Sequence, residues 1–184
     1  MIRLFIAVNC DDETKKLLIS IQNNIRAQSP KGNFSRPENL HLTLVFLGET
    51  QEEMIPAICE AIQAAMYPPI PPFALTFSQT HYREGLWAMG ANQADPSFDT
   101  LKNLRRRITD GLFAAEIAYD KNKPFKPHIT LGWGIRQDAS AMSRTPIGQR
   151  QLEKIALAVN RVSLMKSERI KGASVYTEIF GQTL

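Results

Sequence analysis

Two short segments of the sequence carry the same pattern of residue types around a histidine. His41 and Thr43 lie in LHLTLVFLG, and His128 and Thr130 lie in PHITLGWG. In both segments an aliphatic residue separates His from Thr, Leu follows directly, and Gly is close behind. The copies lie about half the chain apart, which favours an internal duplication over coincidence.

Each of the two patterns is typical of a β-strand with one polar and one apolar side. Because successive strand side chains alternate between faces, His41 and Thr43 are predicted to share one side of their strand. The opposite side is predicted to be apolar and to hold Leu42, Leu44 and Phe46. The second copy repeats this arrangement. A pseudo-twofold axis relating the strands would therefore aim two imidazoles and two hydroxyls into one cleft.

This set of side chains suits the hydrolysis of a phosphodiester. The reaction needs a base that activates water and an acid that protonates the leaving oxygen, and histidine titrates near neutral pH. Threonine hydroxyls can donate hydrogen bonds to the non-bridging oxygens, where charge concentrates. A cyclic 2′,3′-phosphate has no free 2′-hydroxyl, so water must be its nucleophile. The symmetry of the repeat leaves the acid and the base unassigned.

No third histidine or carboxylate lies at metal-ligand spacing near either copy of the pattern. We therefore expect no metal site and no cofactor. The remaining histidine, His81, lacks the threonine and is interpreted as a structural or surface residue.

The elements expected around the two motifs follow an order typical of an α+β protein with largely antiparallel sheet. The predicted strands span residues 2–8, 40–47, 73–79, 85–89, 155–165 and 174–180, with another that begins near Pro127. Three helices are predicted: one capped by Asp11 and ending near Gln28, one opened by a capping box of Thr50 and Glu53 and ending near Met66, and one opened by Asp95 and Pro96. The run YPPIPP, at residues 67–72, is interpreted as a stiff connector.

Composition indicates an ordinary globular protein. The chain has 184 residues, 43% of them hydrophobic, and carries a net charge of +4, which mildly favours anionic partners. Its two cysteines, Cys10 and Cys59, form no disulfide framework or metal-site spacing and are expected to be reduced. No stretch approaches the roughly 20 apolar residues that span a membrane. We therefore expect a monomer in the cytoplasm.

At these motifs the chain resembles the 2H phosphoesterase superfamily, which is named for two H-x-[ST] motifs. Within it, the chain resembles the RNA 2′,3′-cyclic phosphodiesterases, historically called 2′-5′ RNA ligases. The segments that carry the resemblance are RLFIAV, PENLHLTLVFLGE, LWAMG, FKPHITLGWG and SLMKSERIKGASVYTEI. The resemblance implies a single bilobal α+β domain over residues 1–184, with two pseudo-twofold-related lobes of mainly antiparallel sheet, helices outside and a central cleft.

The resemblance also implies an activity and residue roles. It implies metal-independent hydrolysis of the 2′,3′-cyclic phosphate ends of RNA, tRNA fragments among them, to 2′-phosphates, together with reversible 2′-5′ joining of RNA. By this resemblance His41 would be the proton donor and His128 the proton acceptor. Thr43 and Thr130 would hold the phosphate.

The second motif departs from the family pattern. Many members have Arg in the sequence H-x-T-L-x-R, where this chain has Trp133. Arg136 could supply the charge, or Trp133 could stack on a base. Strand alternation favours instead that Trp133 packs on the face opposite His128. This departure leaves substrate affinity and specificity open rather than the reaction class.

Other basic residues are secondary candidates for contacts with substrate. Arg36, Lys126 and Arg83 flank the motifs and are candidate phosphate contacts. Arg105, Arg106 and Arg107 are interpreted as the solvated face of a helix. Two rival functions also stay open. One is a 2H phosphoesterase acting on a small cyclic nucleotide or ADP-ribose cyclic phosphate, and the other is an RNA-end-binding module with little turnover.

Overall fold

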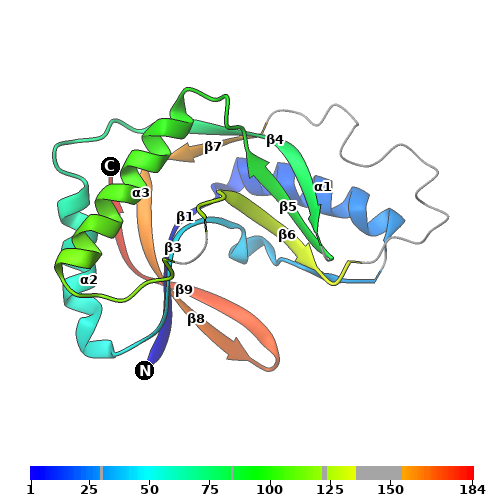
Figure 1. Ribbon diagram of the computed structural model, residues 1–184. Coiled ribbons are helices and arrows are strands. Elements are labelled where there is room, and N and C mark those ends of the chain that lie inside the picture. Colours follow the sequence, from blue (N-terminus) through cyan, green and yellow to red (C-terminus); the bar gives the residue numbers. More distant parts are fainter. Residues whose placement is uncertain (30, 84, 122–123, 136–154) are drawn as a thin grey trace.

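The computed structural model describes residues 1–29, 31–83, 85–121, 124–135 and 155–184, which form a curled antiparallel sheet with helices packed against it (Figure 1). The strands are β1 (Ile2–Asn9), β2 (Asn33–Phe34), β3 (His41–Thr50), β4 (Phe73–Arg83), β5 (Leu86–Ala91), β6 (His128–Trp133), β7 (Ile155–Val159), β8 (Arg161–Ile170) and β9 (Ala173–Thr183). The helices are α1 (Asp12–Gln28), α2 (Ile55–Ala65) and α3 (Ser97–Ala114), with short 3-10 helices η1 (Pro37–Asn39) and η2 (Glu52–Met54).

The order of the strands reveals the predicted pseudo-symmetry. It runs β7-β4-β5-β6-β3-β1-β8-β9, with β2 beside β6. The two central strands, β3 and β6, begin at His41 and His128. They pair antiparallel with Leu42 opposite Ile129, the equivalent positions of the two motifs. The path therefore divides into two matching halves at this pair, as expected for an α+β fold of two pseudo-twofold-related lobes. The halves share one continuous sheet.

The first helix forms where its sequence predicts it. Asp11 caps α1, because its carboxylate accepts a hydrogen bond of 2.7 Å from the backbone N–H of Thr14. Leu18 and Ile25 lie two turns apart on the inner side of the helix and are fully buried. α1 is tied to the far half of the sheet by Gln22, whose side-chain amide donates to the carbonyl of Leu131 at 2.8 Å.

Helices pack on one face of the sheet, and the candidate site lies on the other. α2 and α3 lie side by side (Figure 1), and Arg105 of α3 donates to the Leu44 carbonyl of β3 at 3.1 Å. One large apolar core fills the space between the helices and the sheet. A separate small cluster of Phe5, Ala7 and Met165 belongs to the opposite face. In the described part of the chain, no helix has the length and apolar character to cross a membrane.

The capping box predicted from Thr50 and Glu53 is wrong. Thr50 is the last residue of β3, where it pairs with Ile2 of β1, and its hydroxyl donates to the Gly48 carbonyl. Strand pairing with β1 therefore carries β3 past Gly48, and α2 starts only after the 3-10 turn η2.

Two further element boundaries differ from the prediction. α3 begins at Ser97, so Pro96 rather than Asp95 is its N-cap residue. Asp95 accepts the Ser97 N–H with one carboxylate oxygen and the N–H and hydroxyl of Thr76 with the other, so it joins the helix start to β4. The region 155–165 is two strands, because the chain turns at Asn160 to leave β7 and enter β8. Residues 67–72 connect α2 to β4 without regular structure, as predicted.

Each motif strand contains an irregularity at the same position. In β3 the partners of β1 pass from Val45 to Thr43, which leaves Leu44 as an extra residue. In β6 the partners of β5 pass from Gly132 to Thr130, which leaves Leu131 extra. A bulge of this kind inserts one residue and inverts the alternation of side chains beyond it. Beyond the third residue after each histidine, side chains therefore lie on the face opposite to the one that simple alternation predicts.

Candidate active site

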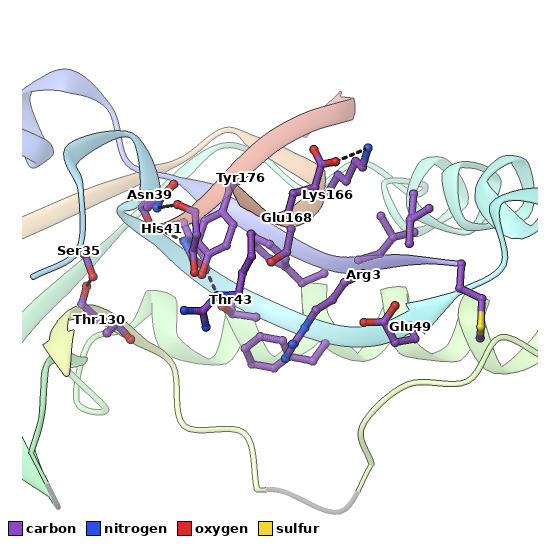
Figure 2. Close-up of a pocket in the computed structure, with 18 of the residues that line it drawn as sticks. Arg3, Ser35, Asn39, His41, Thr43, Glu49, Thr130, Lys166, Glu168 and Tyr176 are labelled. Atoms are coloured by element: carbon purple, nitrogen blue, oxygen red, sulfur yellow. Dashed lines mark hydrogen bonds and ion pairs between the residues drawn. The ribbon is translucent and has the colours of Figure 1, made fainter. Parts of the chain in front are cut away.

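Both motifs face a single pocket of about 640 Å³ on the concave side of the sheet (Figure 2). Its walls include the predicted set of His41, Thr43, His128 and Thr130. The convergence follows from the fold, because β3 and β6 are adjacent and both motifs sit at the first residues of their strands. The sequence prediction that two His–Thr pairs share one cleft is therefore matched by the geometry.

Each imidazole is oriented by a backbone carbonyl two residues earlier in the chain. Nδ1 of His41 donates to the carbonyl of Asn39 at 2.7 Å, and Nδ1 of His128 donates to the carbonyl of Lys126 at 2.7 Å. A carbonyl oxygen only accepts, so the proton of each neutral ring is held on Nδ1. Nε2 of each ring is then the atom that can take up or release a proton.

The first histidine lies in an aromatic enclosure. The rings of Phe5 and Tyr176 lie 4.9 and 5.4 Å from the His41 ring, and the Thr43 hydroxyl lies 3.0 Å from Nε2. Figure 2 shows Tyr176 beside His41 and Asn39. Burial lowers the pKa of His41, an effect that its bond to Asn39 opposes and the charge of His128 reinforces. In the free protein His41 therefore favours the neutral form more than an exposed histidine does.

Two aromatic side chains enter the pocket where a strict strand pattern would bury them. Phe46 is 53% exposed and Trp133 is 46% exposed, and both line the pocket. Each is the fifth residue after its histidine and follows the bulge at the third. The predicted burial of Phe46 and the predicted packing of Trp133 on the face opposite His128 are both wrong, because the bulge returns these residues to the histidine's side.

The other basic residues that were predicted to contact substrate do not line this pocket in the described part of the chain. Arg36 is about half exposed, lies 3.9 Å from Glu38 and lines an adjoining groove rather than this pocket. Lys126 contributes its backbone carbonyl to His128 and keeps an exposed side chain. Arg136 lies outside the described residues, and the described part of Arg83 is its backbone in β4.

Several residues of the site were not predicted from the sequence. Ser35 lines the pocket and donates to the backbone carbonyl of Thr130 at 2.8 Å, which ties the loop after α1 to the second motif. The Asn39 side chain donates to the Ser174 carbonyl of β9 at 2.9 Å. Phe5 and Tyr176 come from β1 and β9, distant in sequence. Of these residues, only Asn39 could have been predicted from the repeat, because it lies two residues before His41.

The end of the pocket away from Ser35 is lined by side chains of both charges. Arg3 and Glu49 lie there, as Figure 2 shows. Lys166 and Glu168 form an ion pair of 2.9 Å along the same wall. Positive and negative groups therefore balance at this end. No group of three or more His, Cys, Asp or Glu side chains in the described ranges is placed to hold a metal ion.

A family model described as the 2′-5′ RNA ligase superfamily matches residues 16–171. The chain therefore belongs to that superfamily, which confirms the resemblance predicted from the two motifs.

Individual relatives and a solved structure agree with this assignment. The chain is similar to the RNA 2′,3′-cyclic phosphodiesterase of Thermus thermophilus, at 31% identity over 95% of this chain and 86% of the relative. It is also similar to the Escherichia coli protein of the same description, at 29% identity over 96% of this chain and 93% of that one. The crystal structure of E. coli LigT complexed with 3′-AMP matches with a TM-score of 0.73 at 25% identity, covering 100% of this chain and 97% of that chain.

Proposed function

We propose that this protein hydrolyses the 2′,3′-cyclic phosphate ends of RNA to 2′-phosphates with its two motif histidines. The observation that carries the proposal is the pocket in which two His–Thr pairs converge from equivalent positions of the two half-sheets. Each imidazole is held by a carbonyl at Nδ1 in the same way, so that Nε2, which in His41 lies 3.0 Å from the Thr43 hydroxyl, is the nitrogen that faces proton transfer. The relatives described as RNA 2′,3′-cyclic phosphodiesterases support the choice of substrate.

The reaction needs one proton accepted and one proton donated. Nε2 of His128 takes a proton from water as the water oxygen attacks phosphorus. The bond from phosphorus to the 3′-oxygen breaks, and Nε2–H of His41 protonates that oxygen, which leaves a 3′-hydroxyl and a 2′-phosphate. The hydroxyls of Thr43 and Thr130 donate to the non-bridging oxygens as negative charge develops there. The direction of these roles follows the family resemblance, because the two motifs are alike.

An acid role for His41 requires that it be protonated when substrate is bound. Burial lowers its pKa in the free protein, and the anionic phosphate next to the ring raises it again by direct charge attraction. Substrate binding therefore supplies the charge that keeps the proton on His41. In 2′-5′ joining, the 5′-hydroxyl of a second RNA would attack phosphorus in place of water. His128 would again take the proton of the nucleophile, and His41 would again protonate the leaving 3′-oxygen.

The test is hydrolysis of a short RNA ending in a 2′,3′-cyclic phosphate, with EDTA present throughout. Wild type is expected to give a 2′-phosphate, and His41→Asn and His128→Asn are each expected to lower kcat by about 10²- to 10⁴-fold. Lys102→Gln, which removes an exposed charge on α3, is the control and should keep full activity. Activity that EDTA abolishes, or that survives both histidine substitutions, contradicts the proposal.

A further inference from the structure

A second groove, of about 790 Å³, adjoins the catalytic pocket. The two share several wall residues, among them Trp133, Arg169 and Tyr176. Tyr176 also packs against His41. The second groove is therefore continuous with the place where the phosphate would react.

Three arginines from separate parts of the chain line this second groove. Arg26 belongs to α1, Arg36 precedes η1, and Arg169 lies near the end of β8. Among the described residues that line the groove, none is acidic. We call this region the arginine groove and define it by Arg26, Arg36, Arg169, Phe34 and Trp133.

The charges of the three guanidinium groups are only weakly neutralised by neighbouring side chains. Arg26 donates to the side-chain oxygen of Asn23 at 3.2 Å, and Arg169 donates to the Gly172 carbonyl at 3.0 Å, so both use neutral partners. Arg36 lies 3.9 Å from Glu38, and both side chains are more than half exposed. Such an exposed pair at the limit of contact distance is weak. The groove is therefore a positively charged surface.

Aromatic rings are interleaved with these charges. The guanidinium of Arg26 lies over the ring of Phe34, 4.5 Å from its centre. Trp133 lies at the junction of the groove with the catalytic pocket and is 46% exposed. Positive charge that follows a phosphate backbone, combined with exposed aromatic faces, is the combination that binds single-stranded nucleic acid.

The opposite end of the catalytic pocket offers no comparable surface. Arg3 lies there with Glu49 and Glu52, and Lys166 pairs with Glu168 at 2.9 Å, so positive and negative groups balance. A polyanion leaving the pocket is thus drawn toward the arginine groove. The cyclic phosphate is at the 3′ end of its RNA, so the rest of the strand must leave the pocket in the 5′ direction.

We propose that the arginine groove binds the RNA nucleotides on the 5′ side of the cyclic phosphate, with Trp133 stacking on a base where the strand leaves the catalytic pocket. This proposal rests on the proposed function, and it makes an oligoribonucleotide, rather than a mononucleotide, the preferred substrate. The arginines contact upstream phosphates that a cyclic mononucleotide lacks.

The test compares two substrates in two matched triple variants. One variant, Arg26→Gln/Arg36→Gln/Arg169→Gln, removes the charges of the groove. The other, Lys16→Gln/Lys102→Gln/Arg106→Gln, removes the same charge from exposed helix positions outside both cavities. The substrates are a hexaribonucleotide ending in a 2′,3′-cyclic phosphate and adenosine 2′,3′-cyclic monophosphate.

The groove variant is expected to lose about tenfold or more of kcat/KM on the hexanucleotide and to lose much less on the mononucleotide, because of the three arginines only Arg169 also lines the catalytic pocket. The control variant should lose much less on the hexanucleotide. In wild type, the log of kcat/KM for the hexanucleotide should fall more steeply with log salt concentration than in the groove variant, by a slope difference of about 2. Equal losses on both substrates, or equal losses in both variants, would overturn the proposal.

Binding separates failure of the groove from failure of the proposed function. A fluorescent hexaribonucleotide ending in a 2′-phosphate is titrated with each protein, and anisotropy is recorded. Weaker binding in the groove variant alone supports the groove whether or not wild type shows turnover. Unchanged binding in the groove variant rejects it even if cyclic phosphates are hydrolysed.

Discussion

The two halves of the sheet treat their histidines alike in backbone and differently in surroundings. Both rings donate from Nδ1 to the carbonyl two residues earlier, and both strands carry a bulge at the third residue and an aromatic side chain at the fifth. The ring of His41, however, packs against Phe5 and Tyr176. The hydrogen bond that Nδ1 of His128 donates is exposed to solvent. The duplicated backbone sets where the rings point, and burial in its own surroundings lowers the pKa of His41.

The largest expected effect concerns whether the two histidines act as one unit. Relative to the single variants, the double variant His41→Asn/His128→Asn is expected to lose little further kcat, because residues that share one reaction step are strongly non-additive. The measurement is a double-mutant cycle on kcat with a cyclic-phosphate RNA. A double variant whose loss equals the product of the two single losses would mean that the halves work independently.

The next effect distinguishes the two threonines. Thr43→Val and Thr130→Val are each expected to lower kcat by roughly 10- to 100-fold, since each removes a donor to the developing negative charge. Thr43 also lies 3.0 Å from Nε2 of His41, so its loss should in addition move the pH profile. Thr43→Ser and Thr130→Ser retain the hydroxyl and serve as matched controls. Identical pH profiles in the two valine variants would remove this distinction between the halves.

The smallest effect concerns the enclosure of His41. Tyr176→Ala admits water to the ring, so the lowered pKa of His41 should rise toward its ordinary value near 6.5. A proton donor is lost as pH rises through its pKa, so in the pH profile of kcat/KM the alkaline limb should move to higher pH, by less than about one pH unit. Tyr176→Phe keeps the ring and should leave that limb in place. A shift to lower pH would show that burial is not the dominant cause.

Local patterns in the sequence were enough to predict the family and the two strands that carry the His–Thr motifs. The His–Thr repeat needs only alternation to place both groups on one side, and His41 and Thr43 obey it. The exposure of Phe46 and Trp133 could not be found this way. It depends on bulges whose register is set by the neighbouring strands β1 and β5.

The enclosure of His41 and the start of the second helix likewise depend on distant segments. Tyr176 contacts His41 from β9, and the residues around the motif give no pattern that predicts this contact. Thr50 has the local signature of a helix cap, but pairing with Ile2 gives its backbone a strand partner instead. Local preference yields at such places to contacts between residues far apart in the chain.

The pairing of Leu42 with Ile129 at the centre of the sheet has a consequence for how the two halves can change. In a symmetric dimer of identical chains, every substitution appears on both sides of the axis. Here the axis runs within one chain, so each half can be altered alone and dilution cannot separate them. The arginines that gather at one end of the cleft and the balanced charges at the other are an asymmetry that a symmetric homodimer could not have.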